Sequence, residues 1–172
     1  MRKWLFAIMA VLAFYLDNMF FIFINLYGIR PDITLALVVS LGVLLGSGPA
    51  AVTGLIMGLI ADVLFNKIVG LSALCYMLSG FAAGLFYRKF FADNLVIPTV
   101  TAIICFFIKE HIFMAASLLT GARPSYFLAL GTYVLPSLLL TGGVCLLLHL
   151  FLKKALFRPL WRNEAIKLEN NE

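Results

Sequence analysis

The sequence predicts an all-α integral membrane protein, a compact bundle of six transmembrane helices with both the N- and the C-terminus in the cytoplasm. Hydrophobic residues make up 63% of the 172 residues and charged residues only 12%, whereas soluble domains are nearer half apolar and a quarter charged. Long apolar runs alternate with short polar segments, and most cations gather in alternate segments. This composition leaves little chain for a soluble catalytic domain.

Six apolar runs, each bounded by charged residues, glycine or proline, are the candidate spans. In chain order they cover Trp4–Asn25, Ile33–Leu45, Pro49–Phe65, Leu71–Tyr87, Leu95–Thr120 and Tyr126–Leu152. Arg2 and Lys3 precede the first run as in a signal peptide, but no A-x-A cleavage site follows, so we expect an uncleaved first helix. We expect residues 1–152 to form one transmembrane domain and residues 153–172 a basic cytoplasmic tail.

The second run is the weakest candidate, because thirteen helical residues cover only about 20 Å. A five-span alternative therefore fuses the second and third runs into one bent segment. Charge decides between the two topologies. With six spans, nine cations lie inside (Arg2, Lys3, Arg88, Lys89, Lys153, Lys154, Arg158, Arg162 and Lys167) and three outside (Arg30, Lys67 and Arg123). With five spans the basic tail would lie outside, against the positive-inside rule.

The loops contain residues that reverse the chain or begin helices. Pro31 and Asp32 precede the second run, where a carboxylate suits a helix N-terminus. The segment Gly46-Ser-Gly-Pro49 predicts a tight reversal, with Pro49 in the first turn of the next helix. These features favour separate second and third spans.

Small residues recur four apart, as in helix faces that pack closely. The three G-x-x-x-G pairs are Gly42/Gly46, Gly54/Gly58 and Gly80/Gly84. We expect these glycine faces to pack against other helices of the chain rather than to receive a partner. Asp62 extends the stripe of Gly54 and Gly58, so that face should turn toward protein, where Asp62 would hold helices in register or belong to a binding site.

Three charged residues form a predicted polar layer within the membrane: Asp17, Asp62 and Lys109. Each lies about thirteen residues into a span that enters from the cytoplasm, so the three should share one depth. We expect Lys109 to pair with Asp62 or Asp17, since pairing makes such charges tolerable in lipid. The neighbouring Glu110 and His111 point elsewhere around the helix.

No pattern typical of catalysis, metal binding or nucleotide binding occurs in the sequence. The three cysteines lie in apolar runs without C-x-x-C spacing, which is typical of small core residues. We therefore expect no enzyme activity and no cofactor. The basic ends indicate cytoplasmic flanks and lipid contact, and nucleic-acid binding is the poorer interpretation.

From Arg30 to Arg88 the order of features resembles the MreD family of bacterial rod shape-determining membrane proteins. The matching elements are Arg30-Pro31-Asp32, the glycines at 46 and 48, the stretch Gly54–Asp62, Gly70 at the start of the next helix, Gly80–Gly84 within it, and the pair Arg88-Lys89. Lys67 departs from the family, which commonly has small or apolar residues there. About a third of the chain carries this likeness.

The resemblance implies a non-enzymatic scaffold of the cell-elongation machinery in the bacterial inner membrane. Such proteins are thought to bind MreC in the membrane and thereby connect cytoskeletal MreB to RodA and a penicillin-binding transpeptidase. Small-residue faces at Gly54, Gly58, Gly80 and Gly84 could receive a partner helix. The tail, with Lys153, Lys154, Arg158 and Arg162, suits lipid headgroups or a cytoplasmic partner.

A second class of function stays open: the substrate-capture subunit of a vitamin or small-solute transporter. These subunits also have six helices and few charges, and the family resemblance implies a similar fold. In that interpretation Asp17, Asp62 and Lys109 would line a solute pocket. Recovery of MreC or of ATP-binding cassette subunits from native membranes discriminates between the two.

Overall fold

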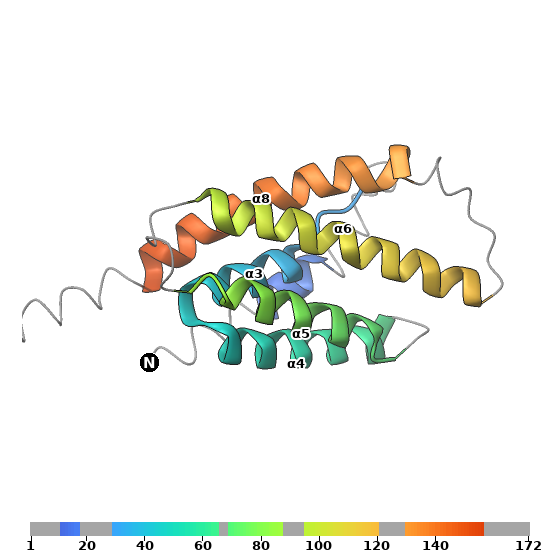
Figure 1. Ribbon diagram of the computed structural model, residues 1–172, viewed down its shortest axis with the longest axis horizontal. Coiled ribbons are helices and arrows are strands. Elements are labelled where there is room, and N and C mark those ends of the chain that lie inside the picture. The colour runs from blue at the N-terminus through green and yellow to red at the C-terminus, as the bar shows by residue number, and fades with distance from the viewer. Residues whose placement is uncertain (1–10, 18–28, 66–68, 88–94, 121–129, 157–172) are drawn as a thin grey trace, which may run out of the picture.

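The computed structural model describes residues 11–17, 29–65, 69–87, 95–120 and 130–156 (Figure 1). These residues are helical apart from short connections, and no strand occurs among them. A short helical piece at 11–17 precedes α3 (Ile33–Leu45), α4 (Ser47–Phe65), α5 (Leu71–Gly84), α6 (Val96–Leu119), the π-helical turn η2 (Leu130–Val134) and α8 (Leu135–Leu156).

The helix boundaries agree closely with the predicted runs where the chain is described. The run at Ile33–Leu45 is α3 itself, and the next two helices differ from prediction by two or three residues at one end. The described part of the predicted last span starts with η2 at Leu130, and most of the predicted first span lies outside the described residues. The number of membrane crossings and the side of each terminus remain predictions.

The short helix α3 lies at the centre of the bundle. It packs against α4 and α5 on one side and against α6 and α8 on the other (Figure 1). Eleven of its thirteen residues are buried, including Leu35 and Val39 in the core shared with α6 and α8. Helix α3 is therefore apolar on all sides because other helices of the chain surround it.

A single residue, Gly46, separates α3 from α4. Its φ of 97° lies in the left-handed region, where a side chain would be strained, and its N–H donates to the Gly42 carbonyl at 2.9 Å. The chain thus reverses sharply, and α3 and α4 form two helices that pack side by side. The second and third predicted runs are therefore two separate helices and not one bent segment.

Helices α4 and α5 form a hairpin in which glycines bring the backbones together. A Cβ atom at Gly54 would collide with the Tyr76 carbonyl, and one at Gly58 with the backbone of Ala73. On α5, a Cβ at Gly80 would lie 2.7 Å from the Ala50 oxygen, and one at Gly84 would overlap Ser47. The small-residue faces therefore serve packing within the chain.

Within the described ranges, three helical segments are long and apolar enough to cross a membrane: Ser47–Phe65, Val96–Leu119 and Leu130–Lys154. Their outer faces expose large apolar side chains such as Val63, Ile104 and Leu139, an arrangement that suits lipid contact. The helices α3 and α5 are shorter apolar helices. These features are those of an α-helical membrane protein.

Candidate functional site

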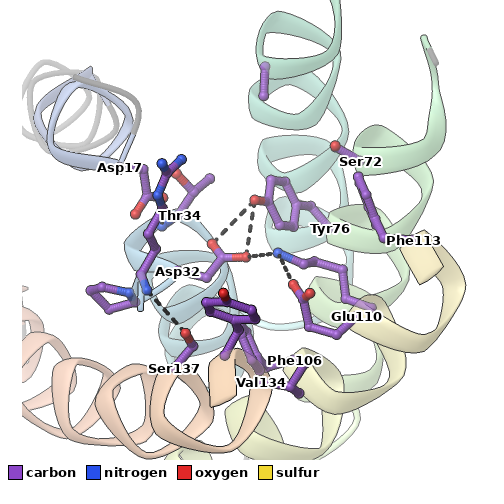
Figure 2. A pocket seen from close by; sticks show the side chains of 15 residues that line it. Asp17, Asp32, Thr34, Ser72, Tyr76, Phe106, Glu110, Phe113, Val134 and Ser137 are labelled. Atoms are coloured by element: carbon purple, nitrogen blue, oxygen red, sulfur yellow. Dashed lines mark hydrogen bonds and ion pairs between the residues drawn. The ribbon is translucent and has the colours of Figure 1, made fainter. Parts of the chain in front are cut away.

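A polar pocket of about 310 Å³ opens where the N-terminus of α3 meets α5, α6 and the start of α8 (Figure 2). Its lining combines charged and aromatic side chains, which is unusual in so apolar a chain. These are the carboxylates of Asp17, Asp32 and Glu110, the cations of Arg30 and Lys109, and the rings of Tyr76, Phe106, Phe113 and Tyr133. Arg30 and Tyr133 are exposed, so the pocket reaches the surface.

Asp32 is the central group of this pocket. As the N-cap of α3, its Oδ1 accepts a hydrogen bond from the Leu35 N–H at 2.7 Å, as the position after Pro31 predicts. The Tyr76 hydroxyl lies 3.1 Å and 3.2 Å from the two carboxylate oxygens, and Lys109 Nζ lies 2.6 Å from Oδ2. One buried carboxylate thus joins α3, α5 and α6.

Lys109 is held by two carboxylates and surrounded by rings. Its Nζ also lies 3.2 Å from Glu110 Oε1, and it stands 5.2 Å, 5.6 Å and 5.8 Å from the ring centroids of Phe106, Phe113 and Tyr76. Ion pairing and cation–π contacts together make a charge tolerable at this depth in the bundle.

The predicted pairing of Lys109 with Asp62 or Asp17 is wrong. Asp17 instead accepts hydrogen bonds from the backbone N–H groups of Ile33 and Thr34, at 2.6 Å and 2.5 Å. It therefore caps the first turn of α3 from the preceding helical piece. The N-terminus of α3 consequently carries two carboxylates, Asp17 and Asp32.

Asp62 has a separate role at the N-terminus of α5. Its oxygens accept from Gly70 N at 2.9 Å, Ala73 N at 3.1 Å and Ser72 N at 3.2 Å, and its side chain is fully buried. Gly70 precedes α5 with a φ of 100°, which turns its N–H toward the carboxylate. Asp62 does not line the pocket, so of the predicted layer only Asp17 and Lys109 do so.

Hydroxyls of α8 hold the chain that leads into α3. Ser137 Oγ accepts from Arg30 N at 3.0 Å, and Thr141 Oγ1 accepts from Asp32 N at 3.0 Å while donating to the Ser137 carbonyl. These two residues lie one helical turn apart on the face of α8 that meets α3. They fix the pocket wall that contains Pro31 and Asp32.

Several residues that line or support the pocket have no recognisable signal in the sequence. Tyr76, Ser137 and Thr141 lie in apolar runs far from Asp32 in the chain, and only the packing of α5 and α8 around α3 brings them together. From its position on the helix, Glu110 is predicted to point away from Lys109. In the structure its flexible side chain nevertheless reaches the Lys109 ammonium.

The remaining polar candidates lie away from the pocket. His111 forms a hydrogen bond with the Phe107 carbonyl one turn back, as a packing histidine does. Both ring nitrogens of the buried His149 lack a hydrogen-bond partner.

Of the basic tail residues, Lys153 and Lys154 lie in the last turn of α8, and Arg158 and Arg162 lie outside the described residues. Cys75, Cys105 and Cys145 are unbridged thiols, and in the described ranges no His, Cys, Asp or Glu cluster could hold a metal.

A comparison with known protein families gives a match. The model of the family described as rod shape-determining protein MreD covers residues 1–159 of this chain. No curated protein and no solved structure matches the chain significantly.

Proposed function

From the premise that this chain belongs to the MreD family, whose members take part in rod shape determination, we propose that it is a non-enzymatic scaffold of the cell-elongation machinery. In this proposal it spans the bacterial inner membrane six times with both termini in the cytoplasm. It binds MreC directly and so links MreB to RodA and a penicillin-binding transpeptidase. The basic end of α8 then contacts lipid headgroups on the inner side.

The open polar pocket is the observation that carries this proposal. The glycine faces of α4 and α5 are filled by each other's backbones, so they leave no room for a partner's helix. The pocket, in contrast, presents unfilled volume and charged groups at the surface. Buried polar side chains kept in a membrane domain commonly mark a binding site. We therefore propose that the pocket receives the segment of MreC nearest the membrane.

The six-span topology assigns this pocket to the outer side. Arg30 lies in the first outer loop of that topology, and Tyr133 lies near the outer end of the last span. MreC spans the membrane once in this proposal and continues outside, so its chain would pass the mouth of the pocket as it leaves the bilayer.

Substitution of Tyr133 tests the proposal. Tyr133 lines the pocket and is 44% exposed, whereas Tyr15 is 58% exposed and lies elsewhere. Loss of a ring at the centre of an interface costs more than about 1 kcal/mol, so Tyr133→Ala should reduce MreC recovery from native membranes by about fivefold or more. Tyr15→Ala is the matched control and should leave recovery unchanged.

Cell shape gives the second measurement in the same experiment. A rod-shaped host depleted of its own copy should regain rod shape with the wild-type chain and the Tyr15→Ala variant, and should widen with Tyr133→Ala. If the folded wild-type chain recovers no MreC, or depletion leaves cell shape unchanged, the scaffold proposal is wrong.

The transporter interpretation keeps one supporting observation: Asp17 and Lys109, two of its three predicted residues, do line a pocket. At about 310 Å³ the pocket is at the small end of ligand sites. Mass spectrometry of the purified chain decides this alternative. A bound vitamin, or co-purified ATP-binding cassette subunits, would favour it over the scaffold.

A further inference from the structure

The charges lining the pocket do not balance. Three carboxylates face two cations, and two of the carboxylates, Asp32 and Glu110, share the single ammonium of Lys109. In the described part of the chain no cation lies within ion-pair distance of Asp17. Glu110 is 31% exposed, so a face of its carboxylate remains accessible. The lining therefore has one carboxylate more than it has cations.

The interior of the pocket offers an anion little to bind, and the second lining cation, Arg30, lies exposed at the mouth. The first turn of α3 would attract an anion through its free N–H groups. The chain's own carboxylates already take those positions, with Asp17 on Ile33 and Thr34 and Asp32 on Leu35. Lys109, the nearest cation, is likewise neutralised by Asp32 and Glu110.

The aromatic lining indicates what kind of cation fits. Lys109 Nζ already lies 5.2–5.8 Å from three ring centroids, so this wall stabilises an organic ammonium. Tyr133, on the side of α8, adds a fourth ring that is 44% exposed beside the remaining volume. Carboxylates combined with ring faces suit an ammonium or a guanidinium, whereas a bare metal ion prefers more oxygen ligands.

We infer that the pocket is a binding site for a basic side chain, a guanidinium or ammonium group, that enters between Asp17 and Glu110 and stacks on Tyr133. The inference rests on the proposed function in one respect: the side chain is supplied by the partner's segment next to the membrane. The pocket volume suits a single side chain, and carboxylates are the groups that a forked guanidinium donor binds.

A direct binding experiment tests the site without the partner. The full chain in lipid nanodiscs is titrated with N-acetyl-arginine amide, and thermal unfolding is measured. N-acetyl-citrulline amide is the matched neutral probe, since it has nearly the same shape without the charge. We expect the arginine compound to raise the melting temperature by about 2–4 °C at saturating concentration, and the citrulline compound to leave it unchanged.

Carboxylate variants assign the effect to the pocket. Glu110→Gln and Asp17→Asn should each remove at least half of the shift, whereas Asp62→Asn should keep it, because Asp62 caps a helix but does not line the pocket. If Asp17→Asn weakens the fold, the melting-temperature shift of Glu110→Gln alone decides whether the probe binds in the pocket. Equal shifts with the two probes, or an undiminished shift in Glu110→Gln, overturn the inference.

Failure of this inference and failure of the scaffold proposal give different results. The arginine compound should also release captured MreC, and the citrulline compound should not. If the arginine compound neither shifts the melting temperature nor releases MreC that the wild-type chain captures, the basic-side-chain inference fails and the scaffold stands. If the arginine compound binds but no MreC is captured, the site stands and the scaffold proposal fails.

Discussion

At the scale of single residues, the main feature is a set of carboxylates that cap helix N-termini inside a membrane domain. Asp17 and Asp32 satisfy the first N–H groups of α3, and Asp62 satisfies those of α5. Free N–H groups are costly where no water reaches them. The same carboxylates can also compensate a buried cation, as Asp32 does for Lys109.

The ion pair of Asp32 and Lys109 gives a prediction at this scale. Lys109→Met keeps the length of the side chain but removes its charge, which leaves a buried carboxylate without its cation. We expect a loss of unfolding free energy of about 3 kcal/mol. The double variant Lys109→Met, Asp32→Asn should lose less than the sum of the two single changes. Unfolding titrations in mixed micelles measure both; strict additivity would show that the pair is not coupled.

The sequence predicted that these charges would be paired, but it did not predict their partners. Asp32 was expected at a helix N-terminus, and it lies there. Asp62 was expected to share a layer with Lys109 because both lie at similar distances into their spans. Depth in the membrane does not take account of the nearest hydrogen-bond donors. The start of α5 follows α4 closely and offers three N–H groups to Asp62. The N–H groups of the neighbouring helix therefore provide the hydrogen bonds that the Asp62 carboxylate needs, and it does not pair with the more distant Lys109 ammonium.

At the scale of helices, the α4–α5 hairpin has the most extensive helix–helix contact among the described residues. Glycines on both helices face the backbone of the other, so the spacing recognised in the sequence corresponds to a real interface. The boundaries of α3 to α6 were also predictable from apolar runs and turn residues. The central position of α3 was not, because a helix that is apolar all round looks the same whether lipid or protein surrounds it.

Two glycine substitutions test this interface against a matched control. Gly84→Ala places a methyl group into the backbone of Ser47 and should destabilise the fold by about 1–3 kcal/mol through overpacking. Gly143→Ala on α8 meets nothing within 4 Å and should be neutral or stabilise by about 0.5–1 kcal/mol. Thermal unfolding in the same detergent compares them. Equal effects at both positions would contradict the packing role of Gly84.

At the scale of the whole molecule, the sparse charges divide into two groups. Cations at helix ends predict the sides of the membrane, and the charges of the pocket lie within the bundle. Composition and charge alone could thus predict a helical membrane protein. They could not predict the pocket, because it is assembled from α3, α5, α6 and α8, and contacts between distant helices leave no pattern in the sequence.

Cysteine labelling tests the predicted topology. In a background without Cys75, Cys105 and Cys145, the exposed Arg30 and Lys154 are replaced singly by cysteine. Six spans require five crossings between these positions, so a membrane-impermeant maleimide should label Arg30→Cys in intact cells and Lys154→Cys only after permeabilisation. The five-span alternative has four crossings there and gives the same side for both.

The enclosure of α3 has a consequence for how the chain enters the membrane. Its thirteen residues cover about 20 Å, less than the roughly 30 Å of a bilayer's hydrocarbon core. Released alone from the insertion machinery, α3 would have little to retain it there. The hydroxyls that hold its entry belong to α8, more than a hundred residues later in the chain. The centre of the protein is therefore completed only after α8 has been made, and a chain truncated before α8 lacks the wall that fixes α3.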